Sequence, residues 1–439
     1  MKQILSFFLC LALLTGFVGC GQTSQSATQA QQATMPTIAV FDPKAPVAPE
    51  TEPESPEDIL AHRRDVVEQH MRYMSTVRWS VDSDVTYSYK GIVAGVADAE
   101  STITLRAGRV YQGIPYTHGS GSAYGFLDYA VSQDENGVYQ LSGLNQEALD
   151  GVSRSKMGHQ SRVGNDCADM VYWAWAQISS SISFENTNHM TPAYGCLPVG
   201  DYEWNEALMR TSTVPTCQEN GMQRMFAAYA QLQKGDAIVR IVDSGGGHAI
   251  MIVTTHVEYN GDEIDGEKSY VTILEQGSGP EVEEQTVVDE KTGETIYLCE
   301  KTDQERTFAT LYQLGYLPIT CKELIDPSPL PETEVTDSVE QPSLENLYNG
   351  TVTSNYRISS VTITVWNADG QPVQQLVCHA METEKFTFML NRIKDKWEQS
   401  VLVGNLDINA LTPGTYRCTY DCRVSTGEVI TFRDFTFTK

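Results

Sequence analysis

The stretch that decides the expected fold is Asn165-Asp166-Cys167-Ala168-Asp169-Met170-Val171-Tyr172-Trp173-Ala174-Trp175. Its cysteine stands between two acidic residues, at the head of an apolar run that is compatible with a helix. A thiol at a helix N-terminus lies near the positive end of the helix dipole, which lowers its pKa. The stretch therefore predicts a helix that begins at Cys167 and presents a reactive thiol. The competing interpretation is a packing residue, because free cysteine is among the most buried residue types.

Two apolar runs further along the chain supply a histidine and an acid. They are Gly247-His248-Ala249-Ile250-Met251-Ile252-Val253 and Tyr270-Val271-Thr272-Ile273-Leu274-Glu275-Gln276, both expected as strands. An imidazole can hold a neighbouring thiol as thiolate, and a third group can orient that imidazole. Side chains alternate along a strand, so only one of Glu275 and Gln276 can meet His248. We predict Glu275, because a carboxylate stabilises an imidazolium better than an amide does.

Glycines precede this histidine. The run Gly245-Gly246-Gly247 lacks the lysine and hydroxyl residue that follow a phosphate-binding loop. It predicts instead a close approach of backbone near a site.

The charge balance limits the partners. The chain has 439 residues, with 30 Lys plus Arg against 57 Asp plus Glu and a net charge of −27. Such acidity argues against nucleic acid and against an anionic membrane surface as electrostatic partners. The length predicts at least two domains.

Residues 1–20 have the pattern of a secretory signal. Lys2 precedes the apolar run 4–18, and Gly19 precedes Cys20. The ending resembles the lipobox of bacterial lipoproteins, with Phe17 where leucine is usual. This resemblance implies a lipid on Cys20 and a place on the extracellular face of the bacterial cell membrane, held by that anchor. An ordinary signal peptide cut elsewhere is the alternative.

The rest of the chain divides by composition. We expect a flexible tether at 21–55, an α+β domain at 56–325, a linker rich in proline and acids at 326–345, and an all-β module at 346–439. The α+β domain opens with an amphipathic helix at 56–77, whose Arg63-Arg64 pair is expected on the solvated face. Residues 125–163 are expected to be a polar insertion.

The C-terminal module has short alternating strands with turns between them, such as Asn367-Ala368-Asp369-Gly370. This pattern predicts an antiparallel sandwich that resembles bacterial immunoglobulin-like modules. Cys418 and Cys422 lie four residues apart on one strand, too far to bridge each other. Any disulfide in this module is therefore expected to join Cys378 to one of them.

The order of cysteine, histidine and acid resembles the NlpC-type peptidases, papain-like enzymes that trim bacterial peptidoglycan. The phrases that carry the resemblance are Gly113-Ile114-Pro115-Tyr116, Asp166-Cys167, Gly235-Asp236 and Gly247-His248-Ala249-Ile250. The resemblance covers roughly residues 56–320. Ala168 and Asp169 replace the family's Ser-Gly, and His118 stands where the family has tryptophan, which puts preference for an ordinary stem peptide in doubt.

The resemblance implies a papain-like catalytic domain that hydrolyses amide bonds in peptidoglycan peptides through Cys167, His248 and Glu275, without metal or cofactor. It places Tyr116, Asp166 and Gln276 at the oxyanion or substrate, with backbone N–H groups of the helix start as oxyanion donors. Two alternatives stay open. One is an amidase like the related CHAP enzymes, and the other is an inactive papain-fold binding module.

Overall fold

The computed structural model describes residues 55–93, 96–117, 121–144, 152–154, 158–160, 164–184, 186–205, 211–242, 246–276, 285–379, 386–394 and 402–439. The expected signal segment with Cys20, the tether up to residue 54, and His118 lie outside these ranges. All the described residues belong to one compact unit. In the described part, no helix combines the length and the apolar character needed to cross a membrane.

The first described helix begins at the residue that the sequence predicts, Pro56. Helix α2 (Pro56–Thr76) has Pro56 in its first turn, and the Ser55 hydroxyl accepts a hydrogen bond from the Asp58 N–H. The expectation for Arg63 and Arg64 was wrong, since they are only 5% and 7% exposed. Their guanidinium groups are buried because they donate to carbonyl oxygens of the distant segment 323–328 and, from Arg64, to a carboxylate.

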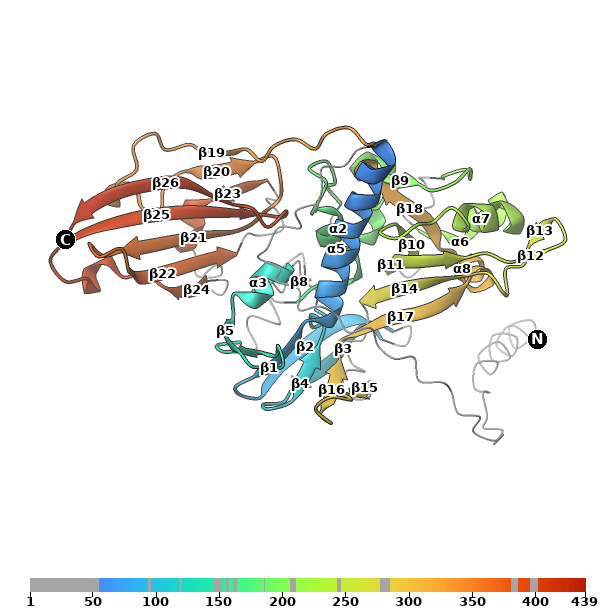
Figure 1. Ribbon diagram of the computed structural model, residues 1–439, viewed down its shortest axis with the longest axis horizontal. Helices are drawn as coiled ribbons and strands as arrows, with labels where there is room; N and C mark the ends of the chain where they lie inside the picture. Colours follow the sequence, from blue (N-terminus) through green and yellow to red (C-terminus); the bar gives the residue numbers. More distant parts are fainter. Residues whose placement is uncertain are drawn as a thin grey trace, which may run out of the picture. The chain divides into compact units, whose positions relative to one another are not determined.

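The central sheet is antiparallel throughout. Its strand order is β17 (Glu300–Thr307), β14 (Tyr270–Gln276), β11 (Gly247–His256), β10 (Ala237–Ile241), β18 (Leu317–Cys321) and β9 (Cys196–Pro198). Helix α5 (Cys167–Trp175) packs against β11 and β14, and α2 packs against α5 (Figure 1). All residues of α5 are buried, as its apolar composition requires. The helix ends at Trp175.

A second sheet has the order β15 (Thr286–Val288), β16 (Thr295–Leu298), β4 (Val110–Gln112), β1 (Arg78–Val81), β6 (Tyr139–Leu141) and β5 (Ala130–Gln133). The expectation that 125–163 is merely a polar insertion was wrong for its first part. Helix α3 (Ala123–Leu127) and strands β5 and β6 belong to this layer. The reason is packing, because Phe126 is fully buried with its ring 5.2 Å from that of Trp79.

The other elements of this part are shorter or peripheral. They are β2 (Val85–Val93), β3 (Val96–Leu105), β7 (Val152–Arg154), β8 (Gly158–Gln160), η1 (Thr187–His189), η2 (Pro192–Tyr194), α6 (Val214–Asn220), α7 (Met222–Tyr229), β12 (Tyr259–Asn260), β13 (Glu263–Ile264), α8 (Phe308–Leu314) and η5 (Lys322–Leu324).

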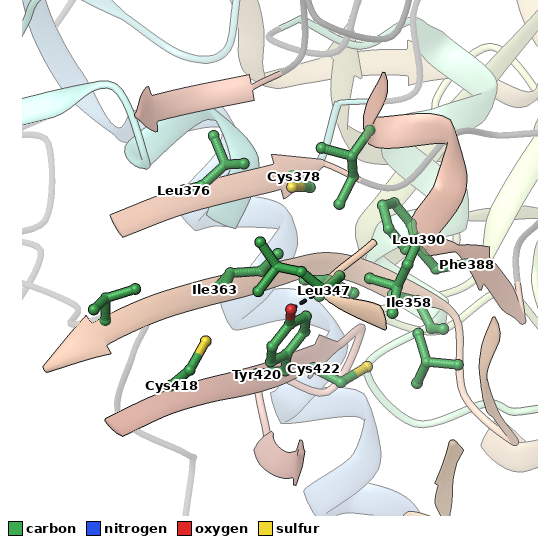
Figure 2. Close-up of a cluster of buried hydrophobic side chains, with 14 of the residues drawn as sticks. Leu347, Ile358, Ile363, Leu376, Cys378, Phe388, Leu390, Cys418, Tyr420 and Cys422 are labelled. Carbon is green, nitrogen blue, oxygen red and sulfur yellow. Dashed lines mark hydrogen bonds between the residues drawn. The ribbon is translucent and has the colours of Figure 1, made fainter. Parts of the chain in front are cut away.

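The C-terminal part consists of two antiparallel sheets around one core. One sheet has the order β24 (Leu402–Asn405), β22 (Pro372–His379), β21 (Ile358–Trp366), β25 (Thr415–Val424) and β26 (Val429–Thr438), and the other β19 (Val335–Asp337), β20 (Thr351–Ser354) and β23 (Thr387–Met389). Short 3-10 helices lie at η6 (Leu344–Asn346), η8 (Leu390–Lys394) and η10 (Ile408–Ala410). Figure 2 shows the core, where the Tyr420 hydroxyl donates to the Leu347 carbonyl oxygen at 2.6 Å.

This β part begins earlier than residue 346. Strand β19 lies inside the segment expected as a linker and pairs with β20. Val335 and Leu344 pack on the core, and the Asp337 carboxylate binds the fully buried Arg433 at 2.7 Å. The run 335–345 is therefore structural rather than a free spacer.

The described cysteines of the β part form no disulfide with one another. Cys378, Cys418 and Cys422 are all buried. Cys378 and Cys422 lie opposite the same residue, Val361, on the two sides of β21. Two strand spacings amount to roughly 9–10 Å, beyond the Cα separation that a disulfide spans.

Candidate active site

The start of helix α5 positions Cys167. Asp166 is the N-cap residue, and its Oδ1 accepts hydrogen bonds from the backbone N–H groups of Ala168 at 2.8 Å and Asp169 at 3.0 Å. We expected the N–H groups of the helix start to be oxyanion donors. Two of these N–H groups are already bound to Asp166, so fewer of them are available to an oxyanion. Cys167, at the first helical position, has no acceptor for its own N–H within the helix.

The thiol of Cys167 is buried, with 6% of the residue exposed. Burial raises its pKa and the neighbouring Asp166 carboxylate adds to the rise, while the N–H groups of Ala249 and Ala168, which hydrogen-bond the sulfur, only partly oppose it. This is the reverse of the expected lowering. The helix terminus favours the anion by about 2 kcal/mol at most, even in partly buried sites, which is less than the cost of desolvating a fully buried thiolate.

His248 and Glu275 meet on adjacent strands. His248 lies near the start of β11 and Glu275 near the end of β14, and His248 Nε2 is 2.8 Å from Glu275 Oε1. The other carboxylate oxygen, Oε2, is 3.0 Å from Arg306 Nη2. Burial alone raises the pKa of Glu275, but the hydrogen bond and charge of His248 and the charge of Arg306 bring it down to about 2. Glu275 is therefore a carboxylate at neutral pH.

Gln276 points away from this pair, as strand alternation predicts. Its Nε2 donates to the Ile114 carbonyl oxygen at 2.8 Å, to Asn165 Oδ1 at 2.9 Å and to Glu300 Oε1 at 3.2 Å. The amide is fully buried. Gln276 thus fixes the two segments that lead to the site, and the prediction that Glu275 contacts His248 is confirmed.

The Tyr116 phrase lies beside the cysteine phrase. Tyr116 forms a parallel bridge with Asn165, and the Thr117 N–H donates to the Asn165 carbonyl oxygen at 3.1 Å. Gly164 is needed for this approach, because a Cβ there would come within 2.3 Å of the Pro115 carbonyl oxygen. The backbone of Tyr116 is therefore brought to the segment just before Cys167.

Close backbone approach before the histidine is also confirmed at Gly247. A Cβ on Gly247 would lie 2.0 Å from Thr187 Oγ1. The 3-10 helix η1 therefore packs directly on the start of β11, where His248 follows.

Sequence analysis missed three residues around the site, namely Arg240, Arg306 and Tyr316. Arg240 is directly opposite His248 in the pairing of β10 with β11. Tyr316 is 4% exposed, and burial raises its pKa, with Glu275 and Cys167 adding to the rise and Arg240 and Arg306 opposing it. Arg240 had a signal, since it is the lone charge in the apolar strand 237–241.

The described residues contain no candidate metal site, since no group of three His, Cys, Asp or Glu side chains among them is placed to hold an ion. His256 Nε2 lies 3.3 Å from Glu258 Oε1.

Comparisons with known proteins give no family. No family model matches the chain, and no curated protein matches it. A tetra-tandem repeat in the extending region of a large adhesion protein is 9% identical, covering 46% of this chain and 41% of that chain, with a TM-score of 0.16. The glycoside hydrolase domain of Endo-D from Streptococcus pneumoniae R6 is 11% identical, covering 43% and 31%, with a TM-score of 0.13. This chain thus spans less than half of either structure, and scores this low carry no argument.

Proposed function

We propose that this chain is a cysteine hydrolase that cleaves amide bonds in bacterial cell-wall peptides, with Cys167 as nucleophile, His248 as base and Glu275 as the residue that orients the base. The observation that carries the proposal is the 2.8 Å contact between His248 Nε2 and Glu275 Oε1, beside a helix whose first residue is Cys167. The N–H of Ala249, the residue after His248, reaches the cysteine sulfur. Nucleophile, base and carboxylate then follow the order of a catalytic triad.

The raised pKa of Cys167 sets the protonation states of the cycle. The thiol is neutral at rest and passes its proton to Nδ1 of His248 as the sulfur attacks the substrate carbonyl, because Nε2 is bound to Glu275. The imidazolium then protonates the leaving amine as the C–N bond breaks. Water, deprotonated by His248, releases the acid from the thioester and restores the thiol.

The oxyanion needs hydrogen-bond donors that are not already bound to Asp166. The Ala168 and Asp169 N–H groups are bound to Asp166. The N–H of Cys167 is the donor we assign, and Tyr116, whose backbone adjoins Asn165, is the second group proposed at the oxyanion.

A second candidate is an inactive binding module with the same fold. The observation in its favour is the burial of Cys167, with its thiol pKa raised rather than lowered. Such a module would bind cell-wall peptide without cleaving it.

The test uses residues 42–439 and purified peptidoglycan, with released fragments identified by mass spectrometry. We expect fragments from this protein and none from Cys167→Ala, while Cys217→Ala, which removes another buried thiol, stays active. The substitution at Cys167 should cost at most a few kcal/mol of unfolding free energy. Equal activity of a folded Cys167→Ala protein would reject the mechanism, and binding without fragments would select the inactive module.

The same fragments identify the bond. Peptides cut internally indicate an endopeptidase, whereas intact peptides freed from sugar indicate the amidase. The proposed lipid anchor at Cys20, on the extracellular face of the membrane, has its own test. Cys20→Ser should move the protein from the membrane fraction to the soluble fraction.

A further inference from the structure

Arg240 lies on the same face of the sheet as the proposed base. The register pairs Arg240 on β10 with His248 on β11. Residues directly opposite in an antiparallel pair have Cβ atoms about 5 Å apart and share a face. The guanidinium group lies over the Tyr316 ring, 5.3 Å from its centroid, and Tyr316 in turn interacts electrostatically with Cys167 and Glu275.

Arg240 has few hydrogen-bond and ion-pair partners in the described part of the chain. Its Nε is buried and has no hydrogen-bond partner there, and no described carboxylate forms an ion pair with it. This is unusual in a protein with 57 acidic residues against 30 basic ones. The neighbouring Arg306 shows the contrast, because it is bound to Glu275 at 3.0 Å.

A buried guanidinium donor without an acceptor is costly unless a ligand completes it. The group that a guanidinium fits best is a carboxylate, which can accept two parallel hydrogen bonds. Glu275 is not that acceptor in this structure, since its two oxygens are directed to His248 and Arg306. The described residues therefore leave this guanidinium group without a carboxylate partner.

We propose that Arg240 binds a carboxylate of the substrate beside the scissile amide, so that the site selects acidic peptides. This inference rests on the proposed function for the identity of the substrate. The ring of Tyr316 holds the guanidinium in place, and the position opposite His248 sets the distance between the bound carboxylate and the reacting amide.

The test compares a stem peptide that has a free glutamate carboxylate with the same peptide amidated at that carboxylate. Affinities for both are measured by calorimetry with the Cys167→Ala protein, and kcat and KM with the active protein. We expect the free carboxylate to be preferred by about ten- to hundredfold, as for a charge-assisted hydrogen bond. Arg240→Gln should remove this preference, and Arg240→Lys should keep part of it.

A purely structural role for Arg240 gives a different result, because Arg240→Gln would then weaken both peptides equally. Arg417→Gln, an exposed arginine paired with Asp434, is the control and should change neither. If Arg240→Gln does not fold, equal affinity of the Cys167→Ala protein for both peptides still overturns the proposal. If the protein cleaves both peptides without preferring the free carboxylate, only the proposal of a carboxylate site at Arg240 is rejected. If binding depends on Arg240 but no cleavage depends on Cys167, only the proposed hydrolase function is rejected. Failure of both binding and cleavage rejects both.

Discussion

At the scale of residues, the charge of Glu275 depends on the groups that contact its two carboxylate oxygens, His248 and Arg306. Its pKa falls from an ordinary 4.5 to about 2 once His248 and Arg306 outweigh the cost of burial. A depressed carboxyl pKa contributes stability above pH 4.5, and that contribution is lost as the pH falls toward 2.

Glu275→Gln should therefore lower the unfolding free energy at pH 7 by an amount on the order of 3 kcal/mol, since each pKa unit corresponds to about 1.4 kcal/mol. The deficit should shrink between pH 4.5 and pH 2. Turnover should also fall, because the imidazolium loses its counter-charge. Urea unfolding at several pH values, with peptidoglycan turnover, measures both. A greater loss of turnover in Gln276→Ala than in Glu275→Ala would reverse the assignment of Glu275.

The pKa of Glu300 is shifted in the opposite direction to that of Glu275. It is 1% exposed, and burial raises its pKa to about 8, although hydrogen bonds from the Ser75 side chain and the Ile114 backbone oppose the rise. For this carboxyl, stability is full below pH 4.5 and is lost as the pH rises toward 8. At pH 7 the penalty is on the order of 3 kcal/mol.

Glu300→Gln should remove this pH dependence. We expect the variant to gain stability relative to the unsubstituted protein as the pH rises from 4.5 to 8, and denaturant midpoints across that range measure the gain. Glu305→Gln, on the same strand, is the control. A stability difference that is flat with pH would contradict burial as the cause.

At the scale of elements, α2 is fastened to the start of β10 by Arg64 and Asp236. The two atoms Nη1 and Oδ1 are 3.0 Å apart, and both side chains are nearly inaccessible. The Thr320 hydroxyl and the Gln233 N–H also donate to the Asp236 carboxylate. Because β10 pairs with β11, this contact also supports the strand of His248.

Arg64→Ala should cost about 3–5 kcal/mol of unfolding free energy, since it leaves a carboxylate buried without its counter-charge. Arg72→Ala on the same helix should cost about 1 kcal/mol or less, because its pairs with Glu68 and Asp303 are partly exposed. Chemical unfolding followed by tryptophan fluorescence compares them. Similar losses of unfolding free energy in the two variants would mean that the buried Arg64–Asp236 pair does not hold α2 against β10.

At the scale of the whole molecule, the β part covers the C-terminal end of helix α5. Arg357 is 3% exposed and lies 4.4 Å over the Tyr172 ring and 4.3 Å over the Trp173 ring. The Ser425 hydroxyl donates to the Ala176 carbonyl oxygen at 2.7 Å. The helix that begins at Cys167 is therefore held at its far end by residues of the β part.

The early start of the β part gives a prediction. Asp337→Ala should cost about 3–5 kcal/mol, because Arg433 is fully buried and loses its carboxylate. Asp434→Ala breaks a pair with Arg417 of the same 2.7 Å length but exposed, and should cost under about 1 kcal/mol. Calorimetric unfolding of residues 42–439 measures both. Equal effects would place residue 337 in a dispensable linker.

Local patterns of sequence determined several elements of the fold. Ser55 and Pro56 predicted the start of α2, the run from Cys167 predicted the start of α5, and alternation separated Glu275 from Gln276. These features could be predicted because capping, helical period and strand alternation each involve residues only a few positions apart.

Only the tertiary structure decided the rest. The sequence alone could not show that Cys167 is desolvated, that Arg63 and Arg64 are buried, that Arg240 lies opposite His248, or that residues 335–337 pair with β20. Burial and strand register are set by contacts between residues far apart in the chain. The sequence thus indicated the cysteine, histidine and glutamate of the candidate site, while long-range packing decided their neighbours and charge states, because desolvation and pairing depend on the whole fold.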